Sequence, residues 1–383
     1  MERRRFIRSA GLVGILATGA APAVHAKPAL RWRLASSFPK TLEITHGSAH
    51  FFAREVRDMS GGKFEIDVHS ADELLPAFDV LDSVQRGTVE CGHTAAYYYI
   101  DRDETFALDC AIPFGLNARQ MAAWLRHGNG LNLLREFYLN YGIVNFPMGN
   151  SGAQMGGWYR KPINSPADLK GLKMRITGLG GKVFARLGGI PVNLPGAEIY
   201  PALERGMIHA AEWVGPYDDL KLGLHKLKLY YAYPGWWEGS TQLSLYVNRR
   251  AYDALTAENK AIIKAAATAA HCDMLTQYDA KNPLALKELI AIGARLTPFP
   301  KTVLDAAHQA ADELYAELAE KNPHWKRIYG SYAAFLRDQT WSWSYTEMAF
   351  ENYRLQRLSE QLKTTEASSS KNRRDRRESP LRD

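Results

Sequence analysis

Arg175 is the residue in this sequence whose chemistry is easiest to assign. It follows a helical turn and lies in a short apolar run with Leu172, Met174 and Ile176. A guanidinium held at the end of a strand can meet a carboxylate through two parallel hydrogen bonds, an arrangement that lysine cannot reproduce. The stretch 150–213, which contains Arg175, therefore predicts one half of a clamp for a small organic acid.

Glu212 is the second residue that could take part in this clamp. A lone carboxylate would repel a bound organic anion unless a cation lay between the two. The amide oxygens of Gln154 and Gln242 and the main-chain carbonyl of Trp213 could complete an all-oxygen coordination shell, which suits Na⁺ or Ca²⁺ rather than zinc. Gln154 is also predicted to contact the acid itself. Two simpler interpretations stay open here: Glu212 in an ordinary salt bridge, and Gln242 in an ordinary hydrogen bond.

Residues elsewhere in the chain are candidates for the remaining walls of the site. Tyr97 and Tyr98 could close it from the opposite side, because a tyrosine hydroxyl binds a carboxylate or keto oxygen while the ring excludes water. If the two tyrosines lie on a strand, one faces the cleft and its neighbour faces the core. Four further residues are predicted to line the walls: Phe38, Asn150, Trp213 and Tyr217.

The sequence lacks the common motifs of catalysis. Residues 149–153 miss the nucleophile-elbow pattern at its last position, and residues 178–183 fit neither a phosphate-binding loop nor a dinucleotide fingerprint. Neither a His-Glu-x-x-His nor a Cys-x-x-Cys pattern occurs. We therefore predict that the protein is not an enzyme. A metal-assisted enzyme that uses Glu212 as a base toward a carboxylic acid is the weaker alternative, because no second acid or base is visible.

The elements that must position these residues begin with an α/β pattern. Apolar residues alternate over 30–34, fall at helical spacing over 52–59, and alternate again over 64–68, with Gly61-Gly62 as the helix stop. A strand, a helix and a second strand at this spacing predict a parallel pair. We also predict a strand over 243–247 that crosses between lobes, and an Ala-rich helix over 261–275.

A weak internal echo suggests two similar halves. Residues 84–91 resemble residues 203–210, and both indicate a helix end, a glycine cap and a short strand that leads into a loop. The first loop holds the two tyrosines and the second holds Glu212 and Trp213. If the match is not a coincidence, each lobe sends one strand-end loop toward a shared cleft, where open sheets bind ligands.

Chain length also favours two lobes, because 27–363 is long for one compact core. The domain boundaries that we predict are 27–150 with about 243–295 for lobe I, 151–242 with about 296–330 for lobe II, and 331–363 for C-terminal helices that pack on the lobes or on a dimer partner. Those helices carry an aromatic stripe for which lobe packing is the first interpretation and a partner surface the second.

Both ends of the chain lie outside the predicted core. Residues 1–26 combine a basic start, a weakly apolar segment shorter than the roughly 20 residues of a membrane span, and Val24-His25-Ala26 at a cleavage position. We predict an export signal, with an order of arginines that suits the twin-arginine route, cleavage after about Ala26, and a periplasmic location. Residues 364–383 predict a disordered basic tail.

These two ends explain most of the positive charge. They carry +3 and +2 of the formal net charge of +7, so the core holds +2 and nucleic-acid binding is not expected. Cys91, Cys110 and Cys272 do not form a disulfide framework. A Cys91–Cys110 bridge is one interpretation, and buried free thiols are the other.

Four motifs carry a resemblance to a known family. They are Asp168-Leu169-Lys170-Gly171-Leu172-Lys173-Met174-Arg175, Gln154-Met155-Gly156-Gly157-Trp158, Glu212-Trp213-Val214-Gly215-Pro216-Tyr217 and Trp236-Trp237-Glu238-Gly239. Together they resemble the DctP-type solute-binding proteins of TRAP (tripartite ATP-independent periplasmic) transporters, and within them the subgroup that binds 2-oxo acids or lactate with a metal ion. The resemblance covers nearly all of the mature chain and leaves out the tail after about Lys363.

The resemblance implies a two-lobed α/β periplasmic binding protein fold with a hinge, connecting strands and long C-terminal helices. It also implies that Arg175 pairs with the ligand carboxylate, that the cleft closes on the ligand, and that the ligand passes to TRAP membrane subunits. We predict a receptor for a small 2-oxo or 2-hydroxy monocarboxylate, similar to pyruvate or lactate. A larger aromatic acid, a dicarboxylate or a sensory role stays open, as does a homodimer that exchanges a helix within 330–362.

Overall fold

The computed structural model describes residues 29–361. The predicted export signal, its cleavage site after Ala26 and the basic tail lie outside these residues. Within the described part of the chain, no helix has both the length and the apolar character that a membrane crossing requires.

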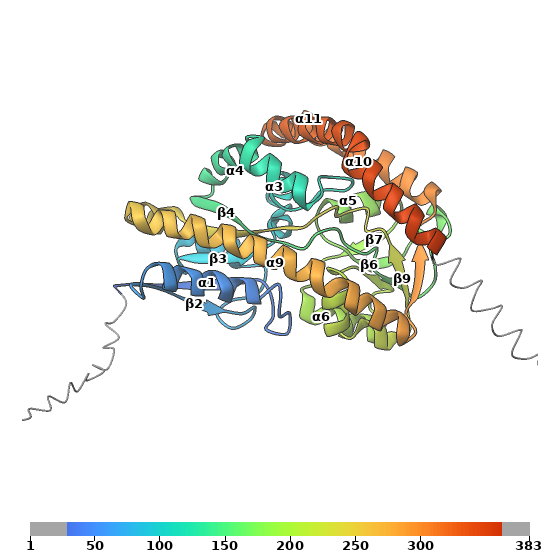
Figure 1. Cartoon of the computed structure of the whole chain (residues 1–383), viewed down its shortest axis with the longest axis horizontal. Helices are drawn as coiled ribbons and strands as arrows, with labels where there is room; N and C mark the ends of the chain where they lie inside the picture. Colours follow the sequence, from blue (N-terminus) through green and yellow to red (C-terminus); the bar gives the residue numbers. More distant parts are fainter. Residues whose placement is uncertain (1–28, 362–383) are drawn as a thin grey trace, which may run out of the picture.

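Two β-sheets organise the chain, and Figure 1 shows one toward each end of the molecule. The first sheet has the order β2-β1-β3-β10-β4, with β1 (Leu30–Ser36), β2 (Phe64–His69), β3 (Cys91–Thr94), β4 (Ile143–Asn150) and β10 (Gln242–Asn248). The second has the order β11-β9-β5-β8-β6-β7, with β5 (Trp158–Tyr159), β6 (Lys173–Arg175), β7 (Ile190–Val192), β8 (Ala210–Ala211), β9 (Tyr230–Tyr233) and β11 (Arg295–Pro298). This arrangement confirms the predicted two-lobed α/β fold.

Helices surround both sheets. Those near the first sheet are α1 (Gly47–Met59), α2 (Val80–Arg86), η1 (Ala96–Tyr99), η2 (Glu104–Asp109), α3 (Ala118–His127), α4 (Gly130–Leu139) and α8 (Arg249–Asp253). Those near the second are η3 (Pro166–Leu169), α5 (Gly178–Arg186), α6 (Gly196–Glu204), α7 (Pro216–Lys221) and η4 (Leu224–Leu227). Three long helices follow: α9 (Ala257–Ala291), α10 (Lys301–Lys321) and α11 (Pro323–Tyr345).

The first strands form as the alternation of residues predicts. β1 and β2 pair in parallel, and β3 extends the parallel arrangement on the other side of β1. Trp32 and Leu34 are buried while Arg31 and Arg33 are exposed, so β1 turns one face to the core and one to solvent. In α1, Phe52 is buried against this face.

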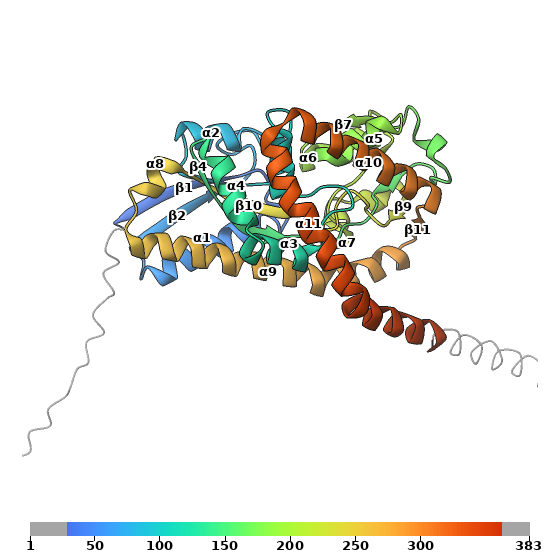
Figure 2. The ribbon, with the colours of Figure 1, turned by 90° about the horizontal axis from the view of Figure 1, so that it is seen from above.

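Two segments connect the lobes. β10 lies antiparallel between β3 and β4, so the chain that has built the second sheet returns to the first at Gln242. Helix α9 runs along both lobes (Figures 1 and 2): it packs on α1 and β4 and also on α7. The predicted helix over 261–275 is therefore part of a longer one, and Pro283 lies inside it. A long helix that contacts both lobes is suited to act as a hinge.

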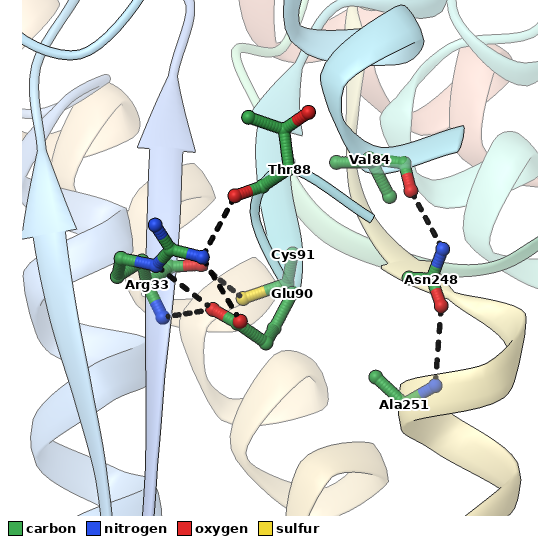
Figure 3. A network of polar contacts seen from close by, with 7 residues as sticks. All are labelled: Arg33, Val84, Thr88, Glu90, Cys91, Asn248 and Ala251. Carbon is green, nitrogen blue, oxygen red and sulfur yellow. Dashed lines mark hydrogen bonds and ion pairs between the residues drawn. The ribbon is translucent and has the colours of Figure 1, made fainter. Parts of the chain in front are cut away.

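A polar network fixes the turn between α2 and β3 (Figure 3). Arg33 donates to the Thr88 carbonyl at 2.7 Å and pairs with Glu90, and the main-chain nitrogen of Arg33 also donates to Glu90 at 2.8 Å. Asn248 donates to the Val84 carbonyl at 2.8 Å, at the C-terminal end of α2. These contacts link β1, β3 and β10, and they hold the strand that leads into Tyr97 and Tyr98.

All three cysteines are free thiols. Cys91 and Cys110 are buried and Cys272 is exposed. The Sγ atom of Cys91 lies 3.6 Å from the Arg33 carbonyl oxygen, within the network of Figure 3. Of the two interpretations of the sequence, buried free thiols are therefore confirmed for Cys91 and Cys110.

The lobes touch across the cleft in this conformation. Thr45, from the first lobe, donates to Asp218 in α7 at 3.0 Å, and Tyr278 of α9 donates to the same carboxylate at 2.7 Å. Lys182 of α5 and Glu104 of η2 form an ion pair at 2.7 Å. These contacts indicate a closed conformation.

The end of the C-terminal helix corrects one prediction. Residues 347–361 continue helically after α11, and Figure 2 shows this segment projecting away from the two lobes. Phe335 packs on the core as expected. The later members of the predicted stripe do not pack on the lobes, because their side chains are exposed: Trp341, Tyr345, Met348 and Tyr353. The same segment still contacts the body on another side, because Glu347 pairs with Arg119 of α3 at 2.6 Å.

Asp219 of α7 should make the stability of the fold depend on pH. Its carboxylate is buried and accepts hydrogen bonds from Trp158 Nε1 at 2.9 Å and from the Tyr231 hydroxyl at 2.7 Å. Burial raises the pKa of Asp219 to about 7, whereas an aspartate in an unfolded chain has a pKa near ~4. The folded state therefore binds the proton more tightly, and this carboxyl reduces stability as the pH rises from about 4 to about 7.

We expect Asp219→Asn to remove this dependence. The variant should be less stable than the wild type at pH 5, because the amide cannot accept both hydrogen bonds as well as the carboxyl does. Between pH 5 and pH 8, the difference in the free energy of unfolding between wild type and variant should narrow by about 2.5 kcal/mol. Urea unfolding at several pH values measures it, with the exposed Asp305→Asn as control. A difference that stays constant with pH would contradict the prediction.

Candidate functional site

Two strand-end loops bring the predicted residues to one cleft. Gly87 and Gly206 both follow a helix with positive φ, at 74° and 72°, and each leads into a short strand. β3 then runs into η1, which carries the two tyrosines, and β8 runs into Glu212 and Trp213. The internal echo in the sequence thus corresponds to equivalent positions in the two lobes.

A glycine allows the Gln154–Trp158 motif to approach the second loop. Gly157 has φ +80°, and a Cβ atom there would lie 2.6 Å from the Ala211 carbonyl oxygen. No other residue type could occupy this position without a shift of β8, the strand that delivers Glu212.

Arg175 and Glu212 form a buried ion pair through Nη1 and Oε1. Each is 1 % exposed. Arg175 also donates from Nε to the Leu194 carbonyl at 3.0 Å and from Nη1 to the Glu212 carbonyl at 3.2 Å, and its guanidinium carbon lies 4.7 Å from the centre of the Trp213 ring. Burial raises the pKa of Glu212 above its ordinary value, and the charge of Arg175 opposes this.

Six of the residues predicted to form the site each have a buried polar atom without a hydrogen-bond partner. Three are donors: Arg175 Nη2, Asn150 Nδ2 and Trp213 Nε1. Three are acceptors: Glu212 Oε2, Gln154 Oε1 and Gln242 Oε1. Buried polar groups in proteins are nearly always paired, so a set of this kind indicates a place for a polar ligand. Donors suit an anion and oxygen acceptors suit a cation.

A small cavity of about 20 Å³ lies between the lobes. Five of the predicted residues line it: Phe38, Tyr97, Tyr98, Gln154 and Trp213. Both tyrosines face it, which corrects the expectation that one of them faces the core. They lie on the 3-10 helix η1, where successive side chains do not alternate between opposite faces as they do on a strand.

Five predicted residues do not line this cavity: Arg175, Glu212, Asn150, Gln242 and Tyr217. Arg175 and Glu212 lie behind Trp213, whose ring contacts the guanidinium. Asn150 and Gln242 are register partners at the ends of β4 and β10, where both are fully buried. Tyr217 is wrongly placed by the sequence: it is half-buried on the outer surface, where its hydroxyl donates to Glu43 at 2.5 Å. Tyr217 follows the cleft loop, but it lies in the first turn of α7, which carries its side chain away from the cavity.

The sequence prediction missed Glu238, Thr241 and Ser151. Thr241 and Ser151 line the cavity. Glu238 is buried, and burial together with the charge of Glu212 raises the pKa of Glu238 to about 8. A signal was present, because Glu238 stands in the Trp236–Gly239 motif, yet nothing in the sequence brings that motif beside Gln154.

The residues at this site fit a hard cation better than a transition metal. Glu212 offers a carboxylate oxygen, and Gln154 and Gln242 offer unpaired amide oxygens. Nowhere among residues 29–361 do three His, Cys, Asp or Glu side chains gather in the way a metal cluster needs. The pair His46 and His50, with Nε2 atoms 3.2 Å apart, is a separate feature at the start of α1.

Comparison with known proteins identifies the family. The model of the family described as DctP, bacterial extracellular solute-binding protein, family 7, matches residues 35–322. This chain belongs to the DctP family. The resemblance seen in the four motifs is therefore confirmed, and the receptor is an extracytoplasmic solute-binding protein by family.

Relatives of this DctP-family protein share its length and fold. A monocarboxylate 2-oxoacid-binding periplasmic protein of Nostoc is 45% identical over 92% of this chain and 99% of its own. A TRAP transporter solute-binding protein of Bordetella bronchiseptica, a dimer with copurified calcium and picolinate in one of its active sites, has 47% identity and a TM-score of 0.85 and covers 87% of this chain and 99% of its own. A TRAP solute-binding protein of Pseudoalteromonas atlantica, with bound sodium and pyruvate, has 40% identity and a TM-score of 0.82. The match covers 84% of this chain and 98% of that protein's chain.

Proposed function

We propose that this protein is the TRAP receptor for a small 2-oxo monocarboxylate such as pyruvate, bound together with Na⁺ or Ca²⁺. The observation that carries the proposal is the set of unpaired donors and unpaired oxygen acceptors around the Arg175–Glu212 pair. A carboxylate can take the donors, and a cation between that carboxylate and Glu212 can take the acceptors. The pyruvate and metal ions bound by relatives that are 37–40% identical support this assignment.

Each residue has a role in this proposal. Arg175 Nη2 and Asn150 Nδ2 donate to the ligand carboxylate, and Tyr97 and Tyr98 close the cleft over it. Glu212, Gln154, Gln242 and the Trp213 carbonyl are the candidate cation ligands, of which Glu212 is the anionic one. The cation neutralises the repulsion between Glu212 and the ligand, so ligand and metal bind together.

The ligand class follows from chelation. A 2-oxo acid offers a carboxylate oxygen and a keto oxygen that can bind one cation in a five-membered ring. Picolinate, which the Bordetella relative binds with calcium, offers a carboxylate oxygen and a ring nitrogen at the same spacing. An aromatic acid of this shape is therefore the second candidate. A dicarboxylate is less favoured, because Arg175 is the one basic side chain that this proposal assigns to a carboxylate, and the lining of the cavity holds no lysine or arginine for a second one.

The remaining functional assignments are proposals of the same kind. The chain is exported, acts in the periplasm by capture rather than catalysis, and passes its ligand to the membrane subunits of a TRAP transporter. We propose the same lobe boundaries as the sequence predicts, moved by one residue at two places: Gln242 begins β10 of the first sheet, and Arg295 begins β11 of the second.

A titration of intrinsic tryptophan fluorescence tests the assignment. Mature protein is titrated with pyruvate in metal-free buffer and again with Na⁺ or Ca²⁺ restored. We expect metal-dependent quenching, because Trp213 lines the cavity beside Arg175. If the protein responded to picolinate and not to pyruvate, an aromatic acid would replace pyruvate as the proposed ligand. Pyruvate binding of equal affinity without metal would remove Glu212 from a cation site.

We further propose that the C-terminal helix forms a homodimer. Seven large apolar side chains after the body of the protein are exposed: Trp341, Tyr345, Met348, Phe350, Tyr353, Leu355 and Leu358. A solvent-exposed apolar face of this extent favours a partner surface. Trp341 lines a groove of about 700 Å³ between α10, α11 and residues 112–114, and this groove could receive the helix of a second copy.

Truncation tests the dimer. Mature protein that ends at Tyr345 should be monomeric by light scattering after gel filtration, since it lacks five of the seven exposed side chains. The control ends at Gln361 and keeps all seven, and it should remain dimeric. A monomeric full-length protein at high concentration would contradict the proposal.

A further inference from the structure

We propose that Thr241, held by Glu238, positions the side-chain amide of Gln154 so that its carbonyl oxygen, rather than its NH₂ group, serves the cation and ligand. This inference rests on the proposed function, because it assigns the partner of Gln154 Oε1. It concerns residues that the site prediction did not include.

The first step is the pairing of Glu238 with Thr241. The Thr241 hydroxyl donates its hydrogen to Glu238 Oε2. Both residues are 3 % exposed, so water does not compete for this hydrogen bond. Oε2 accepts this hydrogen from Thr241 when the carboxyl is ionised, and also when it is neutral with its proton on Oε1.

The second step follows from the number of hydrogens that a hydroxyl has. Because Thr241 has given its hydrogen to Glu238, its oxygen can act toward other groups only as an acceptor. Gln154 Nε2 donates to this oxygen at 2.7 Å. An amide oxygen in the same place would face a lone pair and be repelled. Thr241 thus requires the NH₂ group of Gln154 on its side.

Ser151 imposes the same orientation independently. Its hydroxyl donates to the Gly152 carbonyl at 3.1 Å, and Gln154 Nε2 donates to the Ser151 oxygen at 3.3 Å. Both hydrogens of the Gln154 amide are therefore used by hydroxyl acceptors. The consequence is the buried and unpaired Gln154 Oε1, in a residue that lines the cavity.

Main-chain hydrogen bonds hold the segment that contains Ser151 and Gln154 against the segment that contains Glu238 and Thr241. Gln154 N donates to the Glu238 carbonyl at 3.2 Å, Gly235 N donates to the Gln154 carbonyl at 3.0 Å, and Ser151 N donates to the Thr241 carbonyl at 3.1 Å. The segments 151–154 and 235–241 are therefore fixed against each other by main-chain hydrogen bonds. A preset acceptor avoids the cost of reorienting an amide when the cation binds.

Four variants test the inference. Thr241→Val has nearly the same shape but has no hydroxyl, and Thr241→Ser keeps the hydroxyl. Glu238→Gln can donate to the Thr241 oxygen, which frees the Thr241 hydrogen to point at Gln154 and favours the reversed amide. Ser240→Ala is the matched control, since it removes a buried hydroxyl of the same loop that bonds the Leu116 carbonyl and not Gln154.

The measured quantity is the Ca²⁺ concentration that gives half-maximal pyruvate binding, with thermal unfolding of each metal-free variant as the fold control. We expect Thr241→Val and Glu238→Gln to raise this concentration at least tenfold, and Thr241→Ser and Ser240→Ala to leave it within about threefold of the wild type. If Thr241→Val does not fold, the Ca²⁺ dependence of Glu238→Gln decides whether the inference holds.

Two results would overturn the inference: unchanged Ca²⁺ dependence in Glu238→Gln, or a loss in Thr241→Ser as large as in Thr241→Val. Failure of the proposed function is distinguishable, because the wild-type protein itself would then show no Ca²⁺-dependent binding of pyruvate.

Discussion

Replacement of Arg175 by lysine is expected to weaken pyruvate binding about 100-fold in the presence of metal. Lysine keeps the positive charge beside Glu212, so the buried ion pair is not left uncompensated. It loses the planar fork that donates to the Leu194 and Glu212 carbonyls and that lies against the Trp213 ring. A loss of about 3 kcal/mol in ligand affinity corresponds to this factor.

Isothermal titration with pyruvate in Ca²⁺ measures the effect. Arg186→Lys is the matched control, because Arg186 forms a bidentate pair with Glu317 on the protein surface, with hydrogen bonds of 3.0 and 2.8 Å. It should bind pyruvate as the wild type does. If Arg175→Lys bound pyruvate with wild-type affinity, Arg175 would be a structural partner of Glu212 and the ligand carboxylate would need another donor.

Replacement of Glu212 by glutamine is expected to abolish the dependence of ligand binding on metal. Glutamine removes the anionic member of the candidate cation set and leaves Arg175 as an unpaired charge at 1 % exposure. Breaking a buried pair in this way typically costs about 3–5 kcal/mol of stability. We therefore expect a lower melting temperature without ligand, and pyruvate affinity that no longer changes when Ca²⁺ is added.

Two measurements separate these effects. Thermal unfolding with and without pyruvate reports the unpaired charge, since a ligand carboxylate should restore part of the lost stability. Pyruvate titration over a range of Ca²⁺ reports the cation. Glu204→Gln, a change of the same kind on the exposed end of α6, is the control. A Glu212→Gln variant that still requires Ca²⁺ would place the cation elsewhere.

The sequence was sufficient for features that a few neighbouring residues encode. Alternation over 30–34 and 64–68 predicted β1 and β2, and both form because every second side chain can be buried. The echo between 84–91 and 203–210 predicted two glycine-capped turns. The motifs within residues 150–213 also indicated Arg175 and Glu212 as site residues. These two residues form the buried ion pair, although they lie 37 positions apart in the sequence.

The sequence was not sufficient where a side chain's surroundings come from distant segments. Tyr217 was predicted as a wall residue of the cleft, yet α7 turns it outward to Glu43, 174 positions away. The aromatic stripe after 340 was interpreted first as lobe packing and second as a partner surface, and its side chains are largely exposed on a helix that projects from the two lobes. Neither environment is encoded by neighbouring residues, because it depends on where a whole helix lies against the two lobes.

What the sequence by itself determined is the inventory of the site: one guanidinium, one carboxylate, amide oxygens and tyrosines at strand ends, together with the local turns that present them. What the tertiary structure decided is which of their atoms are already bonded and which are left. Gln154 offers its oxygen because Thr241 and Ser151 take both amide hydrogens, and Thr241 does so across 87 positions of sequence. Hydrogen-bond capacity is a property of each residue, but its use depends on the packing of the whole chain.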